Sequence, residues 1–163
     1  MKTKGHMIPE KQITHISEQT DWKEAVHQVL NPFFTAGITP ASYEQTVIEQ
    51  IEKLGPYCIL RPGLALIHGP ALPEITKTGL HIARCDQPVF FLHSKTPVTL
   101  LIGACAPQPE QYLQLISSLA VLLRGPYTSE YFQTLDDSQL LAHFAPVLHL
   151  SENNSFRTMQ SAS

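Results

Sequence analysis

The sequence predicts an α/β fold: a three-layer domain in which a central mixed β-sheet is flanked by α-helices. Apolar residues recur at helical spacing near both ends of the chain, and short runs of β-branched and aliphatic residues, separated by Gly and Pro, fill its middle. The run at residues 98–102 is apolar almost throughout. Because such a strand must be covered on both faces, we expect helices on each side of the sheet.

A first helix is expected to begin after Asp21, which is placed as an N-cap with Glu24 as its reciprocal partner. We expect Pro32 to end or kink this helix, and Gly37 stands where a helix would stop. The apolar positions that define the helix are Trp22, Ala25, Val26, Val29, Leu30 and Phe33.

A second helix is expected to follow Thr39, an N-cap with Pro40 in the first turn, and to close at Gly55. Its buried stripe consists of Tyr43, Val47, Ile48, Ile51 and Leu54. Strands are then expected at residues 57–60, 64–67, 79–83 and 98–105. A third helix should follow Pro109, with shorter helical stretches near Glu130 and Leu140.

Length and composition predict a single domain over residues 13–150, with flexible tails at residues 1–12 and 151–163. A chain of 163 residues can bury one substantial core, whereas two full domains would be cramped. Hydrophobic residues make up 43% of the chain and charged residues 15%, which is typical of a packed globular protein rather than a disordered one.

Charge and cysteine usage predict a cytoplasmic protein that binds neither nucleic acid nor the membrane directly. The 11 basic residues are scattered among 14 acidic ones, so we expect no nucleic-acid partner. No apolar run reaches the ~18 residues that span a bilayer, and the polar start lacks the hydrophobic segment of a signal peptide. Cys58, Cys85 and Cys105 are odd in number without CxxC spacing, which indicates reduced thiols.

The segment at residues 55–69 carries the chemistry, because its strand ends in His68 followed directly by Gly69. Gly69 removes the side chain that would stand beside the imidazole, and Gly63 allows a tight turn nearby, so a bulky reactant could approach the ring. A histidine suits transient phosphoryl storage because its free pKa near ~6.5 leaves the ring largely neutral and nucleophilic at cellular pH.

Phosphoryl storage also needs hydrogen-bond donors for the phosphoryl oxygens and a dry rim around the ring. We expect backbone N–H groups near Gly69 and the hydroxyl of Thr78 to be the donors. His93 follows an apolar run and could line the same cleft, although a turn residue is the simpler interpretation. With well-placed donors, such transfer needs no metal and no cofactor, and no histidine, cysteine or carboxylate spacing predicts a zinc site.

The pattern G-P-Y-x-I-L-x-P-G-L-A-L-x-H-G, followed by K-T-G at residues 77–79, resembles the mannitol/fructose/ascorbate class of phosphotransferase system enzyme IIA, most closely its ascorbate-type members. The resemblance extends over roughly residues 13–144. It implies a phosphoprotein of sugar transport, a transferase whose His68 takes a phosphoryl group from the phosphocarrier HPr and passes it to a IIB component. The sugar itself then crosses the membrane through a IIC transporter. The sequence is compatible with a homodimer of this chain but does not decide its oligomeric state.

The chain departs from the family pattern at three positions. The family usually has proline before the active histidine, where this chain has Ile67, and often an arginine two residues after it, where this chain has Pro70. A second histidine commonly begins the helix after the long strand, and Gln111 or Tyr112 stands there. Either residue can donate a hydrogen bond but cannot carry positive charge, so we expect Gln111 as a helper in phosphoryl binding.

Two other functions compete with phosphoryl transfer. One is a regulatory interaction protein that kept the enzyme IIA fold without being coupled to transport, which the missing proline and second histidine favour. The other is a purely structural domain. For a carrier, an exposed apolar rim of Leu66, Ile67 and Leu72 around His68 is expected to receive the partners.

Overall fold

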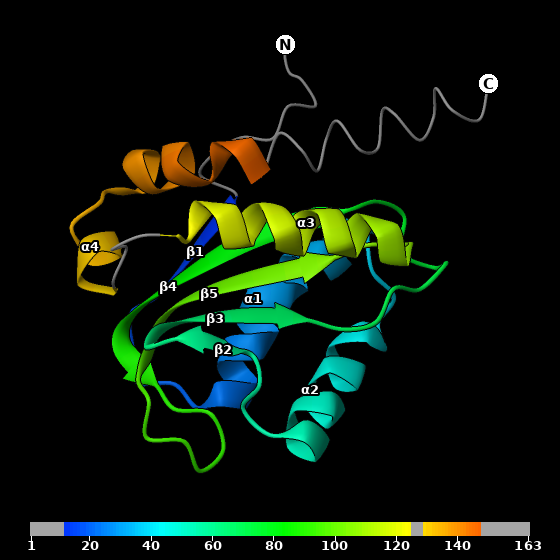
Figure 1. The fold of residues 1–163 in the computed structure, drawn as a ribbon. Coiled ribbons are helices and arrows are strands. Elements are labelled where there is room, and N and C mark those ends of the chain that lie inside the picture. Colours follow the sequence, from blue (N-terminus) through cyan, green and yellow to red (C-terminus); the bar gives the residue numbers. More distant parts are fainter. Residues whose placement is uncertain (1–11, 125–128, 148–163) are drawn as a thin grey trace.

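The computed structural model describes residues 12–124 and 129–147, which form a five-stranded mixed sheet with helices on both faces (Figure 1). The strand order is β1-β4-β5-β3-β2. The strands are β1 (Ile13–Ile16), β2 (Ile59–Arg61), β3 (Gly63–His68), β4 (Gly79–Val89) and β5 (Val98–Cys105). The predicted tails lie outside the described residues, apart from Gln12.

The central strands β3 and β5 run parallel and end at the same edge of the sheet. Their register pairs His68 of β3 with Ala104 of β5. On the other side of β5, the antiparallel β4 pairs Leu80 with the same Ala104. His68, Ala104 and Leu80 therefore form one row across the sheet, so the start of β4 lies at the edge where β3 and β5 end.

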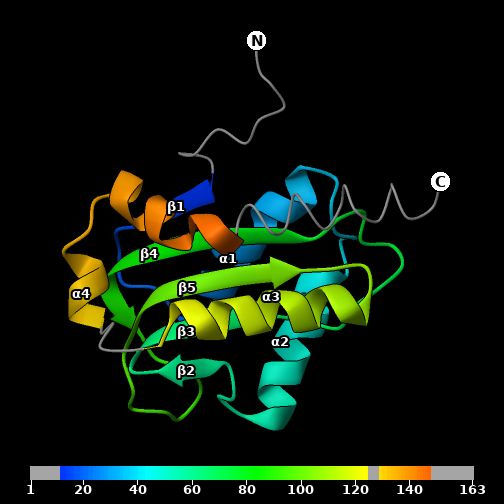
Figure 2. The same ribbon diagram turned by 45° about the horizontal axis from the view of Figure 1, so that its top comes forward.

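Two helical layers cover the sheet, as Figures 1 and 2 show. The first layer contains α1 (Trp22–Thr35) and α2 (Tyr43–Leu54), and the second contains α3 (Pro109–Leu122), α4 (Ser129–Gln133) and a helix at residues 137–147. Ala65 and Ile67 of β3 face the first layer, whereas Leu64 and Leu66 face the second. This alternation places one apolar core on each face of the sheet, which confirms the three-layer α/β prediction.

Helix α1 follows the sequence prediction at its start and passes its proline without ending. The Asp21 carboxylate accepts from the Glu24 N–H at 2.8 Å, whereas the Glu24 carboxylate accepts from Gln28 instead of reaching back. Pro32 lies inside the helix, which ends three residues later, before Gly37 at φ 76°. A proline in the last turn removes only one helical hydrogen bond, so the helix can continue past it.

Helix α2 begins later than predicted, at Tyr43 rather than directly after Thr39, and Ser42 instead of Thr39 occupies its N-cap position. Leu54 is 64% exposed and so does not belong to the buried stripe predicted for this helix. The strand predictions missed β1 and ended β4 six residues early. Strand β1 has only four residues and is paired solely with β4, so its sequence carries little signal of its own.

Two further properties follow from the described residues. Cys58, Cys85 and Cys105 are free and buried, in agreement with reduced thiols. In the part of the chain that the structure describes, none of the helices is long and apolar enough to cross a membrane.

His81 makes the stability of the fold dependent on pH. The side chain is 4% exposed, with Nε2 2.8 Å from the Thr14 hydroxyl, and burial lowers the pKa of His81 from 6.5 to about 4. Between these values the unfolded chain binds a proton that the folded chain excludes, so stability falls as the pH falls through this window. We expect the difference in unfolding free energy between about pH 7 and about pH 4.5 to shrink by about 2 kcal/mol in His81→Gln.

Urea unfolding at the two pH values measures this difference. His93→Gln is the matched control because His93 is exposed, and its difference should equal that of the wild type. An equal loss of pH dependence in both variants would contradict the assignment to His81.

Candidate functional site

His68 is the last residue of β3 and projects toward α3. It follows Leu64 and Leu66 in the two-residue alternation of the strand, so its ring points into the layer that contains α3. There the ring lies against Tyr112, with the two ring centroids 5.3 Å apart and their planes at 49°. His68 remains partly exposed, so a reactant from solvent can reach it.

Tyr43 reaches the same strand end from the opposite layer. It is the first residue of α2, it is 1% exposed, and its hydroxyl oxygen lies 2.6 Å from the Tyr112 hydroxyl. The same oxygen accepts from the Gly69 N–H at 2.8 Å and lies 3.0 Å from the Ala104 carbonyl oxygen. The two helical layers thus meet around the end of the sheet, next to His68.

The directions of these hydrogen bonds follow from counting protons. A carbonyl oxygen can only accept, so the single hydroxyl proton of Tyr43 goes to Ala104. Tyr112 must then donate to Tyr43, whose two lone pairs take the Tyr112 proton and the Gly69 N–H. Every hydrogen-bonding position of the buried Tyr43 hydroxyl is therefore filled.

Both tyrosines are held in their neutral form. Burial raises the pKa of Tyr43 to about 12, and burial together with the neighbouring Tyr43 raises the pKa of Tyr112 well above its usual range. The hydroxyl chain consequently keeps its protons across the physiological pH range and stays a fixed set of dipoles.

Gly69 connects the tyrosines to the imidazole. Its carbonyl oxygen lies 3.2 Å from Nδ1 of His68, and because a carbonyl only accepts, this contact requires the proton on Nδ1. The other ring nitrogen, Nε2, then carries the free lone pair. The predicted strand-ending histidine and glycine are thus brought together, but the Gly69 N–H is taken by Tyr43 and is not a donor for phosphoryl oxygens.

Gln111 and Thr78, the two side chains expected to help in phosphoryl binding, are both buried. Gln111 is 9% exposed, and its Oε1 accepts from the backbone N–H of Gln108 at 3.2 Å, which caps the start of α3. Tyr112, rather than Gln111, faces His68. Thr78 precedes β4 at the same edge of the sheet and is 3% exposed, so its side chain lies in the interior.

His93 and Arg61 lie at the other end of the sheet. Gly63 pairs with Val98, five residues before the His68 end of β3, which places that end about 17 Å away along the strand. His93 lies in the loop between β4 and β5 that precedes Val98, so it is far from His68 and does not share a site with it. Arg61 donates to the carbonyl of Leu123 at the far end of α3.

The predicted apolar rim is wrong for Leu66 and Ile67, whereas Leu72 remains partly exposed. Leu66 and Ile67 are 5% and 0% exposed, because β3 lies between two other strands and is covered on both faces. Leu72 is packed against the core of the first layer. Sequence reasoning also missed Tyr43, which it treated as ordinary core. Its role could have been suspected because a tyrosine in an apolar helical stripe buries its hydroxyl, and a buried hydroxyl needs a polar partner.

The match to a family profile defines the class of protein. Residues 6–145 match the family described as "Phosphoenolpyruvate-dependent sugar phosphotransferase system, EIIA 2". The match covers most of the 163 residues. The chain therefore belongs to this enzyme IIA family of phosphotransfer components, in agreement with the resemblance found in its sequence.

Individual relatives support the same assignment. The "Mannitol-specific cryptic phosphotransferase enzyme IIA component" of Escherichia coli K12 is 29% identical over 135 residues, 83% of this chain and 92% of the relative. The "Ascorbate-specific PTS system EIIA component" of the same strain is 31% identical over 107 residues, 65% of this chain and 70% of the relative.

Solved structures show the same fold. The solution structure of the cryptic mannitol component from E. coli, 29% identical, matches 86% of this chain and 93% of its own with a TM-score of 0.66. Mannitol enzyme IIA of E. coli in complex with phosphorylated enzyme IIB is 22% identical and matches 83% of this chain and 95% of its own, with a TM-score of 0.69.

Gly69 has to be a glycine because α2 approaches the strand end closely. A Cβ at this position would lie 2.9 Å from Cγ2 of Val47 and 3.0 Å from Cε1 of Tyr43. We expect Gly69→Ala to lower the free energy of unfolding by about 1–3 kcal/mol, because the buried helix must shift to admit the methyl group. Chemical denaturation measures this cost. In a Val47→Ala background the cost should be smaller, and an unchanged cost would show that the contact with Val47 is not its source.

Proposed function

We propose that Nε2 of His68 accepts a phosphoryl group from a phosphorylated donor protein and passes it to an acceptor protein. The single observation that carries this proposal is the Nδ1–H···O=C contact between His68 and Gly69, which leaves the Nε2 lone pair on a partly exposed ring. In the transfer, the Nε2 lone pair forms a new N–P bond while the N–P bond of the donor breaks. The donor nitrogen keeps the electron pair of that bond, and Nδ1 keeps its proton.

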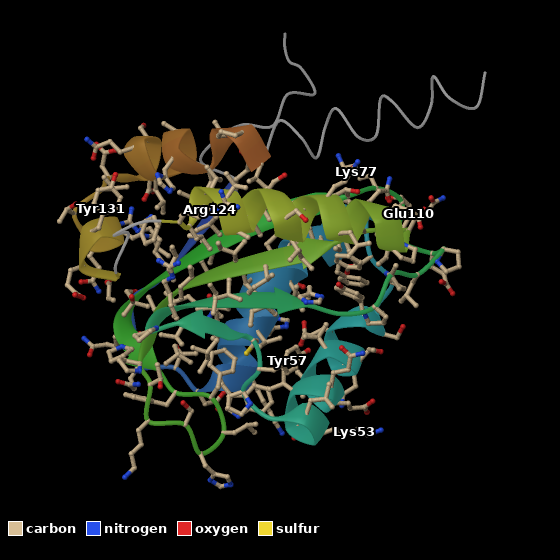
Figure 3. All side chains as sticks on the ribbon, viewed as in Figure 1. Lys53, Tyr57, Lys77, Glu110, Arg124 and Tyr131 are labelled. Carbon is tan, nitrogen blue, oxygen red and sulfur yellow. The ribbon has the colours of Figure 1, made fainter. Side chains whose placement is uncertain are left out.

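Helix dipoles favour the negative charge of the phosphoryl group at this place. Tyr43 is the first residue of α2 and Tyr112 the fourth of α3, so both helices begin at the strand end that carries His68. The amino-terminal ends of helices carry partial positive charge and attract anions. Lys77 adds a positive charge at the end of the molecule where α3 begins (Figure 3).

The family and a relative support the protein partners that we propose. In this proposal the donor is HPr and the acceptor is a IIB component, which in turn serves a membrane IIC transporter. The exchange between these proteins takes place in the cytoplasm. The E. coli mannitol enzyme IIA was solved in a complex with phosphorylated enzyme IIB, which supports a IIB partner for this chain. Phosphoryl transfer between two proteins requires a surface that both partners can cover in turn.

The outer face of α3 supplies such a surface. Leu113 is 67% exposed and Ile116 37% exposed, and Leu113 directly follows the tyrosine that touches His68. No charged residue occurs between Glu110 and Arg124, so the exposed side of this helix is apolar or neutral along its length. Exposed apolar side chains next to a reactive group are typical of a transient protein docking site.

The first test is phosphorylation itself. Incubation with phosphoenolpyruvate, enzyme I and HPr should add one acid-labile phosphate to the wild type, and His68→Ala should take up none because the nucleophile is gone. Phosphorus and nitrogen NMR of the labelled protein should locate the phosphate on Nε2. His93→Ala is the control and should be labelled fully. Equal labelling of His68→Ala and the wild type would rule out the site.

The second test separates docking from chemistry. We expect Leu113→Lys to slow phosphoryl transfer by about tenfold or more, because it places a charge in the apolar contact beside His68. Val121→Lys is the matched control, since Val121 is 56% exposed on the same helix but lies about 12 Å further along its axis. Rates of transfer from HPr at subsaturating concentrations measure the effect. Equal rates for the two variants would contradict docking at the start of α3.

A further inference from the structure

We propose that Tyr43 and Tyr112 are positioning residues that anchor Gly69 through its N–H, so that the carbonyl of the same residue stays beside His68 and keeps the proton on Nδ1. This inference rests on the proposed function, because the value of the fixed proton is that it reserves Nε2 for the phosphoryl group. From the sequence alone, Tyr43 is a core residue and Tyr112 stands where the family has a second histidine. The proposal gives each of them a role in positioning His68.

Gly69 connects Tyr43 to His68, because its N–H and its carbonyl each form a hydrogen bond with one of these two residues. Its N–H donates to the Tyr43 hydroxyl at 2.8 Å, and its carbonyl accepts from Nδ1 of His68 at 3.2 Å. The glycine backbone would otherwise be free to rotate, as it lacks a side chain that restricts it. The N–H belongs to the peptide unit between residues 68 and 69 and the carbonyl to the next unit, so the contact with Tyr43 anchors the residue from which the carbonyl projects toward Nδ1.

In the described part of the chain, the partners of the Tyr43 hydroxyl lie at this strand end or on the helix beside it. The hydroxyl binds the Gly69 N–H, the Ala104 carbonyl and the Tyr112 hydroxyl, and His68 pairs with Ala104 in the sheet. Packing alone would be served equally well by a phenylalanine, which buries a similar ring without a polar group to satisfy. The hydroxyl thus holds two backbone segments beside His68, namely Gly69, which follows it in the chain, and Ala104, which pairs with it in the sheet.

Tyr112 restricts the same imidazole from its other side. Its ring lies 5.3 Å from the His68 ring, and its hydroxyl donates to Tyr43 at 2.6 Å. One residue therefore limits the rotation of the imidazole and fixes the hydroxyl that holds Gly69. Because the two tyrosines come from helices on opposite faces of the sheet, both layers act on one ring.

Phenylalanine variants test this role because they keep both rings and remove only the hydroxyls. In the unphosphorylated wild type, nitrogen NMR of the His68 ring should show the Nδ1–H tautomer as the main neutral form. In Tyr43→Phe and Tyr112→Phe we expect the Nε2–H tautomer to gain about three- to tenfold relative to Nδ1–H, with a similar fall in the rate of phosphoryl uptake. Tyr57→Phe is the control, since Tyr57 is 42% exposed beyond the other end of α2.

The readouts separate positioning from structure and from the proposed function. A lower melting temperature with an unchanged tautomer ratio in both variants would overturn the positioning role and leave only packing. Should Tyr43→Phe fold poorly, Tyr112→Phe gives the same decision. In that variant the buried Gly69 N–H and Ala104 carbonyl keep their hydrogen-bond partner, but the Tyr43 hydroxyl is no longer fixed by the Tyr112 donor. The tautomer ratio is measured without phosphate, so it decides on positioning by itself, whereas a wild type that takes up no label on His68 overturns the proposed function.

Discussion

The hydroxyl of Tyr43 satisfies the buried backbone groups at the end of the sheet, and the site depends on that. Where β3 and β5 stop, their last amide and carbonyl groups lie between two helical layers and cannot reach water. The Gly69 N–H and the Ala104 carbonyl both bind the one hydroxyl, which Tyr112 joins from the opposite face. An unpaired buried polar group would cost about 1–3 kcal/mol, so these contacts hold the strand ends in one arrangement.

The same arrangement gives the reactive ring neutral neighbours. The groups that the structure brings to His68, the Gly69 carbonyl and the Tyr112 ring, carry no charge, and burial keeps both tyrosines protonated. A second histidine at this place would titrate near neutral pH, whereas a tyrosine hydroxyl does not. Under the proposed function, attraction for the phosphoryl group comes from Lys77 and from the ends of α2 and α3, whose peptide dipoles do not change with pH.

The layered fold and the position of His68 at the end of a strand could be predicted from the sequence, because both rest on local patterns. Apolar runs such as residues 98–102 require cover on both faces, and the strand-ending His68 precedes a glycine. The helpers of His68 could not be predicted in this way. Gln111 and Tyr112 are adjacent, and only the phase of α3 against the sheet decides that Tyr112 meets the ring while Gln111 caps the helix. Tyr43 lies 25 residues before His68, and its part in the site depends on where α2 begins.

The docking surface that we propose beside His68 is suited to partners that bind briefly and in one orientation. An apolar face provides attraction without direction, since burial of apolar area depends little on angle. The charges that bracket α3 supply the direction: Glu110 stands at the His68 end and Arg124 at the other (Figure 3). Charges at the rim of an interface mainly steer the approach and fix its register, and they add little to the lifetime of the complex. A carrier that must release each partner after one transfer needs this combination of a small apolar contact and oriented charges.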